Sequence, residues 1–271
     1  MRITALVAGV AVLALGVAGA GLAQQSPPTV TVTASETTLT VGVTGVVAAG
    51  PTRFEIVKAG GKELEIAIAA LRPGVTRAQF MAALQGGDPE AAIELVYLDG
   101  GASLSAGDQR RAVTLSLRPS STYLVINSSG ERPSDWEIAE FAVGGQSNGA
   151  TAPKADASVR IIDLRFRGAT TLPRRGVVRF ENAGWAPHFA VAAPLRRGAR
   201  TRAVGRALRR NDERRLGRLV DFASAVQPQS LITRGAVNFN EVRFPRRGRY
   251  VMACFFEDHQ AQGMYRFIRV R

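Results

Sequence analysis

The scarcest residues of this 271-residue chain are those that could bind a metal ion. The chain has one cysteine, Cys254, and two histidines, His188 and His259, and Met264 follows His259 at the spacing at which His259 follows Cys254. Two imidazoles, a thiolate and a thioether suit copper, because soft sulfur ligands select Cu(I) and imidazole is also a good copper ligand. We therefore expect these four side chains to converge on one copper ion.

Strands and short turns must position these ligands. Cys254 lies in the apolar run 250–255, so a strand of a sheet would fix the direction of its sulfur. Four residues separate Cys254 from His259 and four more separate His259 from Met264, which is short enough for the loop to fold back onto one ion. Gly263 permits an unusual backbone angle just before Met264.

The chain contains one internal repeat. Segment 54–74 matches segment 178–198 at a constant offset of 124, with Ala-Gly and Leu-Arg-x-Gly recurring in both. Each copy continues into a helical stretch and returns to a strand that starts at Tyr123 or Tyr250. A single repeat at this period indicates a duplicated domain. Leu64 stands in the place of His188, and no histidine or cysteine precedes His188, so we expect no such metal site in the first copy.

The pattern inside each copy favours strands. Val30, Val32 and Ala34 alternate with threonines, and short apolar runs are bounded by Gly and Pro, which predicts an antiparallel sandwich or barrel. The stretch from Asn211 instead places its apolar residues on one helical face. We expect Asn211 to cap that helix and its arginines to form a solvated surface.

The N-terminus is typical of a targeting segment. Residues 1–23 combine a positive start, an apolar run and small residues before Gln24, which predicts a signal peptide, with an uncleaved anchor as the alternative. We expect the rest to form a domain over 29–143, a linker over 144–155 and a domain over 156–271. The mature protein would then be exported, to the periplasm or the extracellular space.

The net charge of +13 is concentrated after residue 150, notably in the arginines of 196–218. Such a surface could meet an acidic redox partner or an anionic cell surface. Nucleic acid is not expected as a partner, because no recognition motif accompanies the arginines and the chain is expected to be exported.

These motifs resemble one known family. Asn182-x-Gly184-x3-His188, followed by Cys254-x4-His259-x4-Met264, is similar to the cupredoxin (blue, type 1 copper) family over residues 156–271, and 29–143 resembles it in framework only. The resemblance implies an all-β fold of two tandem cupredoxin-like Greek-key β-sandwiches, each with a short helical insertion. It implies one type 1 copper site in the second sandwich, with His188, Cys254 and His259 as equatorial ligands and Met264 as the axial one.

The resemblance implies an exported electron-transfer protein that cycles between Cu(I) and Cu(II). The alternative is a copper-carrying or metal-free cupredoxin-like binding module at the cell surface. An enzyme is not expected, because multicopper oxidases and copper nitrite reductases need many more histidines. No histidine is left over for a hydrolase base or a zinc site either.

Overall fold

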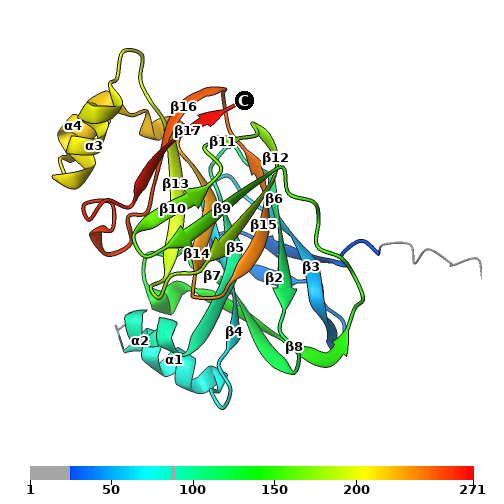
Figure 1. The fold of residues 1–271 in the computed structure, drawn as a ribbon. Helices are drawn as coiled ribbons and strands as arrows, with labels where there is room; N and C mark the ends of the chain where they lie inside the picture. Colours follow the sequence, from blue (N-terminus) through cyan, green and yellow to red (C-terminus); the bar gives the residue numbers. More distant parts are fainter. Residues whose placement is uncertain (1–24, 87–88) are drawn as a thin grey trace, which may run out of the picture.

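The computed structural model describes residues 25–86 and 89–271 (Figure 1). The expected signal peptide, residues 1–23, lies outside the described residues. The elements of the first half are β1 (Thr29–Ala34), β2 (Leu39–Val41), β3 (Val47–Lys58), β4 (Leu64–Leu71), α1 (Arg77–Gln85), α2 (Pro89–Glu94), β5 (Val96–Leu104), β6 (Arg110–Leu117), β7 (Ser121–Asn127), the 3-10 turn η1 (Pro133–Asp135) and β8 (Glu137–Ser147).

The second half repeats this order with small additions. Its elements are β9 (Ala157–Ile162), β10 (Arg165–Gly168), β11 (Thr171–Leu172), β12 (Arg175–Asn182), β13 (His188–Pro194), α3 (Thr201–Arg209), α4 (Glu213–Leu219), the 3-10 turn η2 (Phe222–Ser224), β14 (Val226–Ile232), β15 (Val237–Arg243), β16 (Gly248–Ala253), the 3-10 turn η3 (Phe256–Asp258) and β17 (Tyr265–Val270).

The strand pairings show the duplication that the sequence predicts. In the first half β1 pairs with β2 and β3, β3 with β6, and β4 with β5 and β7. In the second half β9 pairs with β10 and β12, β12 with β15, and β13 with β14 and β16. The predicted offset of 124 carries the first residue of β4 onto that of β13, and α1 onto α3. The mostly-β sandwich fold is therefore confirmed.

The sheets are mixed, which differs from the purely antiparallel arrangement expected from the strand pattern. β1 runs parallel to β3, and β9 runs parallel to β12. β2 and β10 each pair with one edge of the strand before them, and β3 and β12 join the opposite edges of β1 and β9 in the parallel sense. A pattern of short strands predicts the strands but not the direction in which distant ones pair.

The two halves share one sheet. β6 and β15 pair antiparallel at Leu115–Asn238, Thr114–Phe239 and Val113–Asn240, which joins strands of both halves into a sheet of 12 strands. Five further strands, in the order β11-β17-β16-β13-β14, form the other layer of the second half. β8 continues to Ser147, inside the stretch expected to be a linker, and the expected domain boundaries stay a prediction.

Alternation along the strands separates a core face from a helix-covered face. On β16, Tyr250 and Met252 point into the core between the layers, whereas Val251 and Ala253 face α3 and α4. On the first half, α1 and α2 cover the outer face of β4, β5 and β7 in the same way. The helix pairs therefore lie outside the sheets (Figure 1), and the inward positions are left for core residues and ligands.

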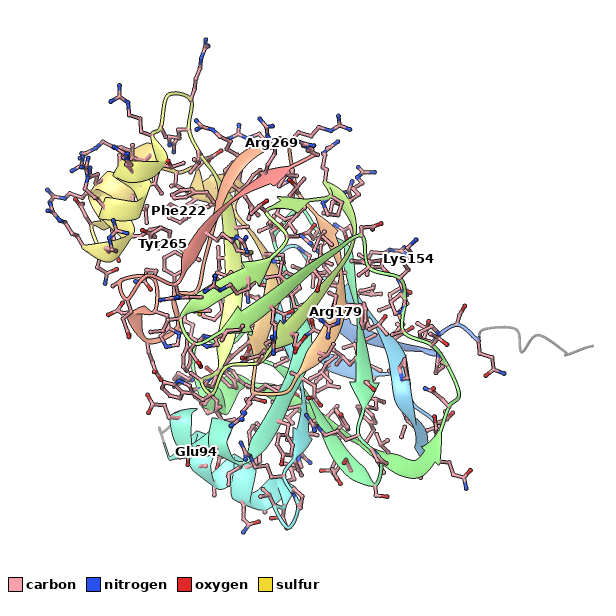
Figure 2. The ribbon with its side chains drawn as sticks, in the orientation of Figure 1. Glu94, Lys154, Arg179, Phe222, Tyr265 and Arg269 are labelled. Carbon is pink, nitrogen blue, oxygen red and sulfur yellow. The ribbon has the colours of Figure 1, made fainter. Side chains whose placement is uncertain are left out.

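The arginine-rich segment is the helix pair α3–α4, from which arginine side chains project outward (Figure 2). The expected cap was wrong: Asp212, not Asn211, caps α4, because its side chain accepts a hydrogen bond from the Arg215 amide. Asn211 instead adopts a left-handed conformation, with φ 50°, between the two helices. Within the described residues, no helix is both long and apolar enough to span a membrane.

Candidate metal centre

Three of the four predicted ligands lie at the ends of strands in the second half, and His259 lies in the loop between β16 and β17. His188 is the first residue of β13, and Cys254 directly follows β16. His259 follows η3, and Met264 directly precedes β17. β13 and β16 are neighbours in the sheet, with Val191 opposite Ala253, so the middle of the chain meets its tail here.

Three donor atoms converge in the interior. The Nδ1 atoms of His188 and His259 are 3.2 Å apart, and the Cys254 Sγ lies 3.9 Å from the first and 3.7 Å from the second. His188 and Cys254 are fully buried, and His259 is 4% exposed. Among the described residues this is the one group of His, Cys or acidic side chains with metal-binding geometry.

Backbone hydrogen bonds connect Met264 to two residues of the cluster. Its amide donates a hydrogen bond of 2.9 Å to the carbonyl of His259, and its carbonyl accepts one of 3.2 Å from the amide of Cys254. The side chain is fully buried in the same apolar cluster as Cys254. Gly263 has φ 104°, as the sequence predicted, which lets the chain turn into this position.

The donor set fits copper. Metal bonds of about 2 Å to nitrogen and about 2.3 Å to sulfur would let one ion touch all three atoms, given separations of 3.2, 3.7 and 3.9 Å. Two imidazoles and a thiolate with a neighbouring thioether are the ligands of a type 1 copper site. The site is cupredoxin-like.

Backbone amides support the sulfur of this cupredoxin-like site. Burial raises the pKa of the Cys254 thiol, and hydrogen bonds from the amides of Phe189 and Phe256 act in the opposite direction. Amides directed at the sulfur stabilise its thiolate form, which is the form that binds metal. Because the donor at position 189 is a backbone amide, its stabilisation of the thiolate does not depend on the side chain of Phe189.

Burial also sets the charge of the histidines. It lowers the pKa of His188 to about 4, with the nearby His259 adding to the effect and Asp163 opposing it. Burial lowers the pKa of His259 as well. Both rings are therefore neutral at pH 7, as metal ligands must be. The Nε2 atom of His188 is buried without a hydrogen-bond partner among the described residues.

Asn182 holds the turn that delivers His188. Its Nδ2 donates to the carbonyls of Ala186 (2.8 Å) and Ile232 (2.9 Å), and its Oδ1 accepts from the Gly184 amide at 3.0 Å. A Cβ at Gly184 would lie 2.8 Å from the amide nitrogen of Asp163, so only glycine fits there. The Asn-x-Gly motif is thus a structural support of the first ligand.

A second support was missed by the sequence reasoning. Asn211, in the turn between α3 and α4, donates to the Asp258 carboxylate at 3.1 Å and accepts from Gln260 Nε2 at 2.9 Å. Asp258 and Gln260 flank His259, so the helix pair ties down the ligand loop. The sequence predicts a helix cap at Asn211, and nothing local in it links Asn211 to residues 47 and 49 positions later.

Apolar side chains surround part of the site. Met252 is fully buried, and the Phe256 ring meets the His259 ring edge-on at 5.7 Å between centroids. Trp185 is different: 73% of it is exposed, so it does not shield the site. It projects to solvent from the turn that leads to His188.

The first half shows what occupies the same places without a metal ligand set. Leu64, 2% exposed, begins β4 as His188 begins β13. Asn127 ends β7 where Cys254 follows β16, and its Nδ2 donates to the carbonyl of Ser35 at 2.6 Å. An apolar side chain and a structural amide thus replace an imidazole and the thiol.

Comparison with known proteins finds similarity at the level of structure. No family model matches the sequence, and no curated protein matches it. The chain is similar to auracyanin B, with 23% identity over 45% of this chain and 93% of that chain at a TM-score of 0.30. A reduced auracyanin from Roseiflexus castenholzii matches with 15% identity over 42% and 94%, at a TM-score of 0.27.

Longer matches include a multicopper oxidase, with 14% identity over 90% of this chain and 88% of that chain at a TM-score of 0.26. A copper nitrite reductase from Nitrosomonas europaea matches with 11% identity over 91% and 94%, at a TM-score of 0.27. Similarities of this size carry no functional argument, so the functional case rests on the geometry of the site.

These longer matches correct one expectation. An enzyme is not expected from a chain with only two histidines, yet the similar structures include enzymes of two kinds. That expectation was wrong, because the number of histidines limits only how many additional copper centres the chain can hold. It does not limit catalysis on this fold.

Proposed function

We propose that the chain is a blue-copper electron-transfer protein, with His188, Cys254 and His259 as equatorial copper ligands and Met264 as the axial one. The observation that carries this proposal is the convergence of two Nδ1 atoms and one Sγ within 4 Å of one another in the interior. Copper bound there would supply one-electron chemistry between Cu(I) and Cu(II).

The protein's part in electron transfer is to keep the ligands in place. Strand ends hold His188 and Cys254, and backbone hydrogen bonds link Cys254, His259 and Met264 into a closed loop. Asn182 and Asn211 restrain the two ligand segments from outside. A site whose ligands move little between oxidation states transfers electrons with little reorganisation, and limited water access helps to set its potential.

We further propose that the protein acts outside the cytoplasm and exchanges electrons with a protein partner. The predicted signal peptide supports export, and the exposed Trp185 gives a partner an apolar contact on the turn before His188. The excess of arginine supports an acidic partner, and association with an anionic cell surface draws on the same charge.

The test is to purify the full mature chain, load it with Cu(II) and record its visible absorption and voltammetry. We expect one copper per chain, strong thiolate-to-copper charge transfer and a reversible couple. Cys254→Ser should abolish the colour, whereas Met264→Leu should keep it and shift the reduction potential, because the axial ligand tunes the potential. Gln262→Ala, on the same loop with an exposed side chain, is the matched control.

Folded protein that takes up no stoichiometric copper would refute the proposal and leave a metal-free binding module. Colourless protein that binds one copper would instead indicate a copper carrier. A Cys254→Ser variant that keeps the colour would show that the thiolate is not a ligand.

A further inference from the structure

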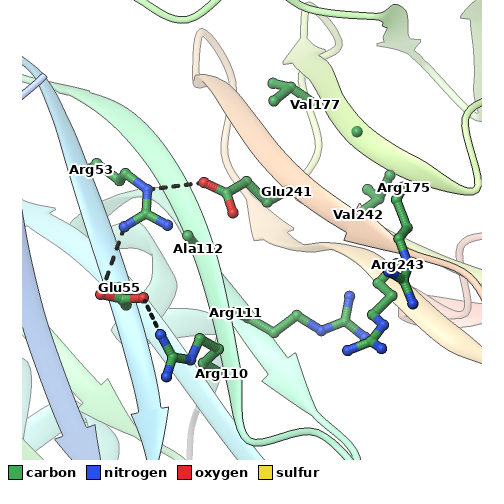
Figure 3. A pocket seen from close by; sticks show the side chains of 11 residues that line it. Arg53, Glu55, Arg110, Arg111, Ala112, Arg175, Val177, Glu241, Val242 and Arg243 are labelled. Carbon is green, nitrogen blue, oxygen red and sulfur yellow. Dashed lines mark hydrogen bonds and ion pairs between the residues drawn. The ribbon is translucent and has the colours of Figure 1, made fainter. Parts of the chain in front are cut away.

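A cavity lies where β6 and β15 separate. β6 pairs with β3 as far as Arg110, and β15 pairs with β12 as far as Arg243, but the pairing of β6 with β15 ends at Val113–Asn240. The cavity between them has a volume of about 400 Å³ and is lined by both halves (Figure 3). Its lining is Arg53, Glu55, Arg110, Arg111, Ala112, Arg175, Gly176, Val177, Glu241, Val242 and Arg243.

The two carboxylates of the cavity are already paired. Glu241 accepts a hydrogen bond of 2.9 Å from Arg53 Nε. Glu55 lies 3.8 Å from an Arg53 nitrogen and 3.4 Å from an Arg110 nitrogen. Two acidic residues of the lining therefore balance two of its five arginines, and the other three have no acidic partner within the lining.

Those three are Arg111, Arg175 and Arg243. Arg175 and Arg243 are directly opposite each other in the β12–β15 pairing, and neither makes an ion pair or side-chain hydrogen bond within residues 25–86 and 89–271. Like charges directly opposite across two strands destabilise a sheet. Figure 3 shows the three guanidinium groups gathered on the side of the cavity away from Glu55 and Glu241.

Arg111 adds an unsatisfied buried donor. Its side chain is 10% exposed, and one Nη pairs with Asp108 at 3.0 Å outside the cavity lining. Its Nε is buried without a partner among the described residues. A buried N–H that lacks an acceptor is costly.

We propose that this cavity binds a small tetrahedral oxyanion, inorganic phosphate, through Arg111, Arg175 and Arg243. Guanidinium groups match phosphate oxygens with paired N–H donors, and a doubly charged anion offsets the repulsion between the opposed arginines. Arg111 belongs to the first half and the other two to the second, so the anion also stabilises the junction between the halves.

The test uses the full mature chain with the substitution Cys254→Ser. This substitution removes the proposed copper thiolate, so that phosphate bound to copper cannot contribute to the measured binding. Titration calorimetry and thermal unfolding are measured with sodium phosphate, against sodium chloride at equal ionic strength. We expect saturable phosphate binding and a rise in Tm beyond that in chloride. Arg175→Gln and Arg243→Gln should each weaken binding roughly tenfold or more.

Arg269→Gln is the matched control, because it removes the same charge from an exposed position of β17 that does not line the cavity. It should change phosphate affinity less than about twofold. In phosphate-free buffer, Arg175→Gln and Arg243→Gln should keep or raise Tm, since each relieves the repulsion. A response to phosphate equal to that in chloride, or binding unaffected by both cavity variants, would overturn the proposal.

Discussion

The Nδ1 atoms of His188 and His259 lie 3.2 Å apart inside the protein, and both face the sulfur of Cys254. Neutral imidazole has one donor nitrogen and one acceptor nitrogen, so without metal only one of the two rings can donate across this gap. The Nε2 of His188 has no partner among the described residues either. Holding the proposed ligands together therefore lowers the free energy of unfolding of the metal-free protein. Substituting these residues one at a time measures by how much.

Replacing His188 by Leu, the residue at the same place in the first half, should distinguish the effect of this residue on copper binding from its effect on the stability of the metal-free protein. Copper-dependent stabilisation should disappear, because a proposed equatorial ligand is lost. The free energy of unfolding without copper should stay equal or rise by about 1–3 kcal/mol, because a buried ring nitrogen without a hydrogen-bond partner among the described residues is removed. Chemical denaturation with and without Cu(II) measures both.

The reciprocal change, Leu64→His, is the control. It places an imidazole in the first half at a position 2% exposed, without a thiol beside it. We expect a loss of about 2 kcal/mol or more and no gain in copper binding. A strongly destabilised His188→Leu protein would contradict the assignment of His188 as a ligand kept for binding.

Asn211→Gly tests the tie between the helix pair and the ligand loop. Glycine tolerates the left-handed conformation of this position but removes the hydrogen bonds to Asp258 and Gln260. The fold should be retained with a loss of about 1–2 kcal/mol, and copper should leave to a chelator several-fold faster. Stopped-flow chelation measures the rate, and an unchanged rate would show that the tie does not restrain the ligands.

Asp108 should make stability depend on pH in the acid range. Burial raises the pKa of its carboxyl, but hydrogen bonds from Arg111 and Ser105 and the charge of Arg111 outweigh burial, so the pKa falls below 3.8. A lowered pKa stabilises the fold above the unfolded-state value, and that contribution is lost as pH falls through the native value. The difference in unfolding free energy between wild type and Asp108→Asn should therefore be constant from pH 7 to near pH 4, at most about 1 kcal/mol, and shrink below it. If the difference in unfolding free energy grew as the pH fell, it would contradict the lowered pKa of Asp108.

Asn238→Ala should weaken the junction between the halves. Asn238 is fully buried on β15, donates to the Asp99 carbonyl at 3.0 Å and accepts from Asn240 at 2.8 Å. Leaving these groups unsatisfied should cost about 2–4 kcal/mol. By calorimetry we expect one unfolding transition in wild type and two in the variant. Val46→Ala, at a position 68% exposed, should leave a single transition.

Much of the site was predictable because its residues are rare and their order is informative. The loops between Cys254, His259 and Met264 are too short for these residues to lie far apart, and the repeat at an offset of 124 aligned His188 with Leu64. The same offset predicted that Leu64 replaces an imidazole in the first half. These inferences depend on local spacing and on side-chain chemistry, both of which the sequence shows directly.

Only the tertiary structure decided which distant elements touch. The β6–β15 pairing joins the halves into one sheet, the separation of these strands opens the arginine-lined cavity, and Asn211 reaches the ligand loop from a helix pair. Each contact unites segments many residues apart, whose meeting depends on how whole sheets stack and twist rather than on neighbouring residues. The sequence by itself therefore indicated the candidate ligands, whereas long-range packing determined which residues surround and support them.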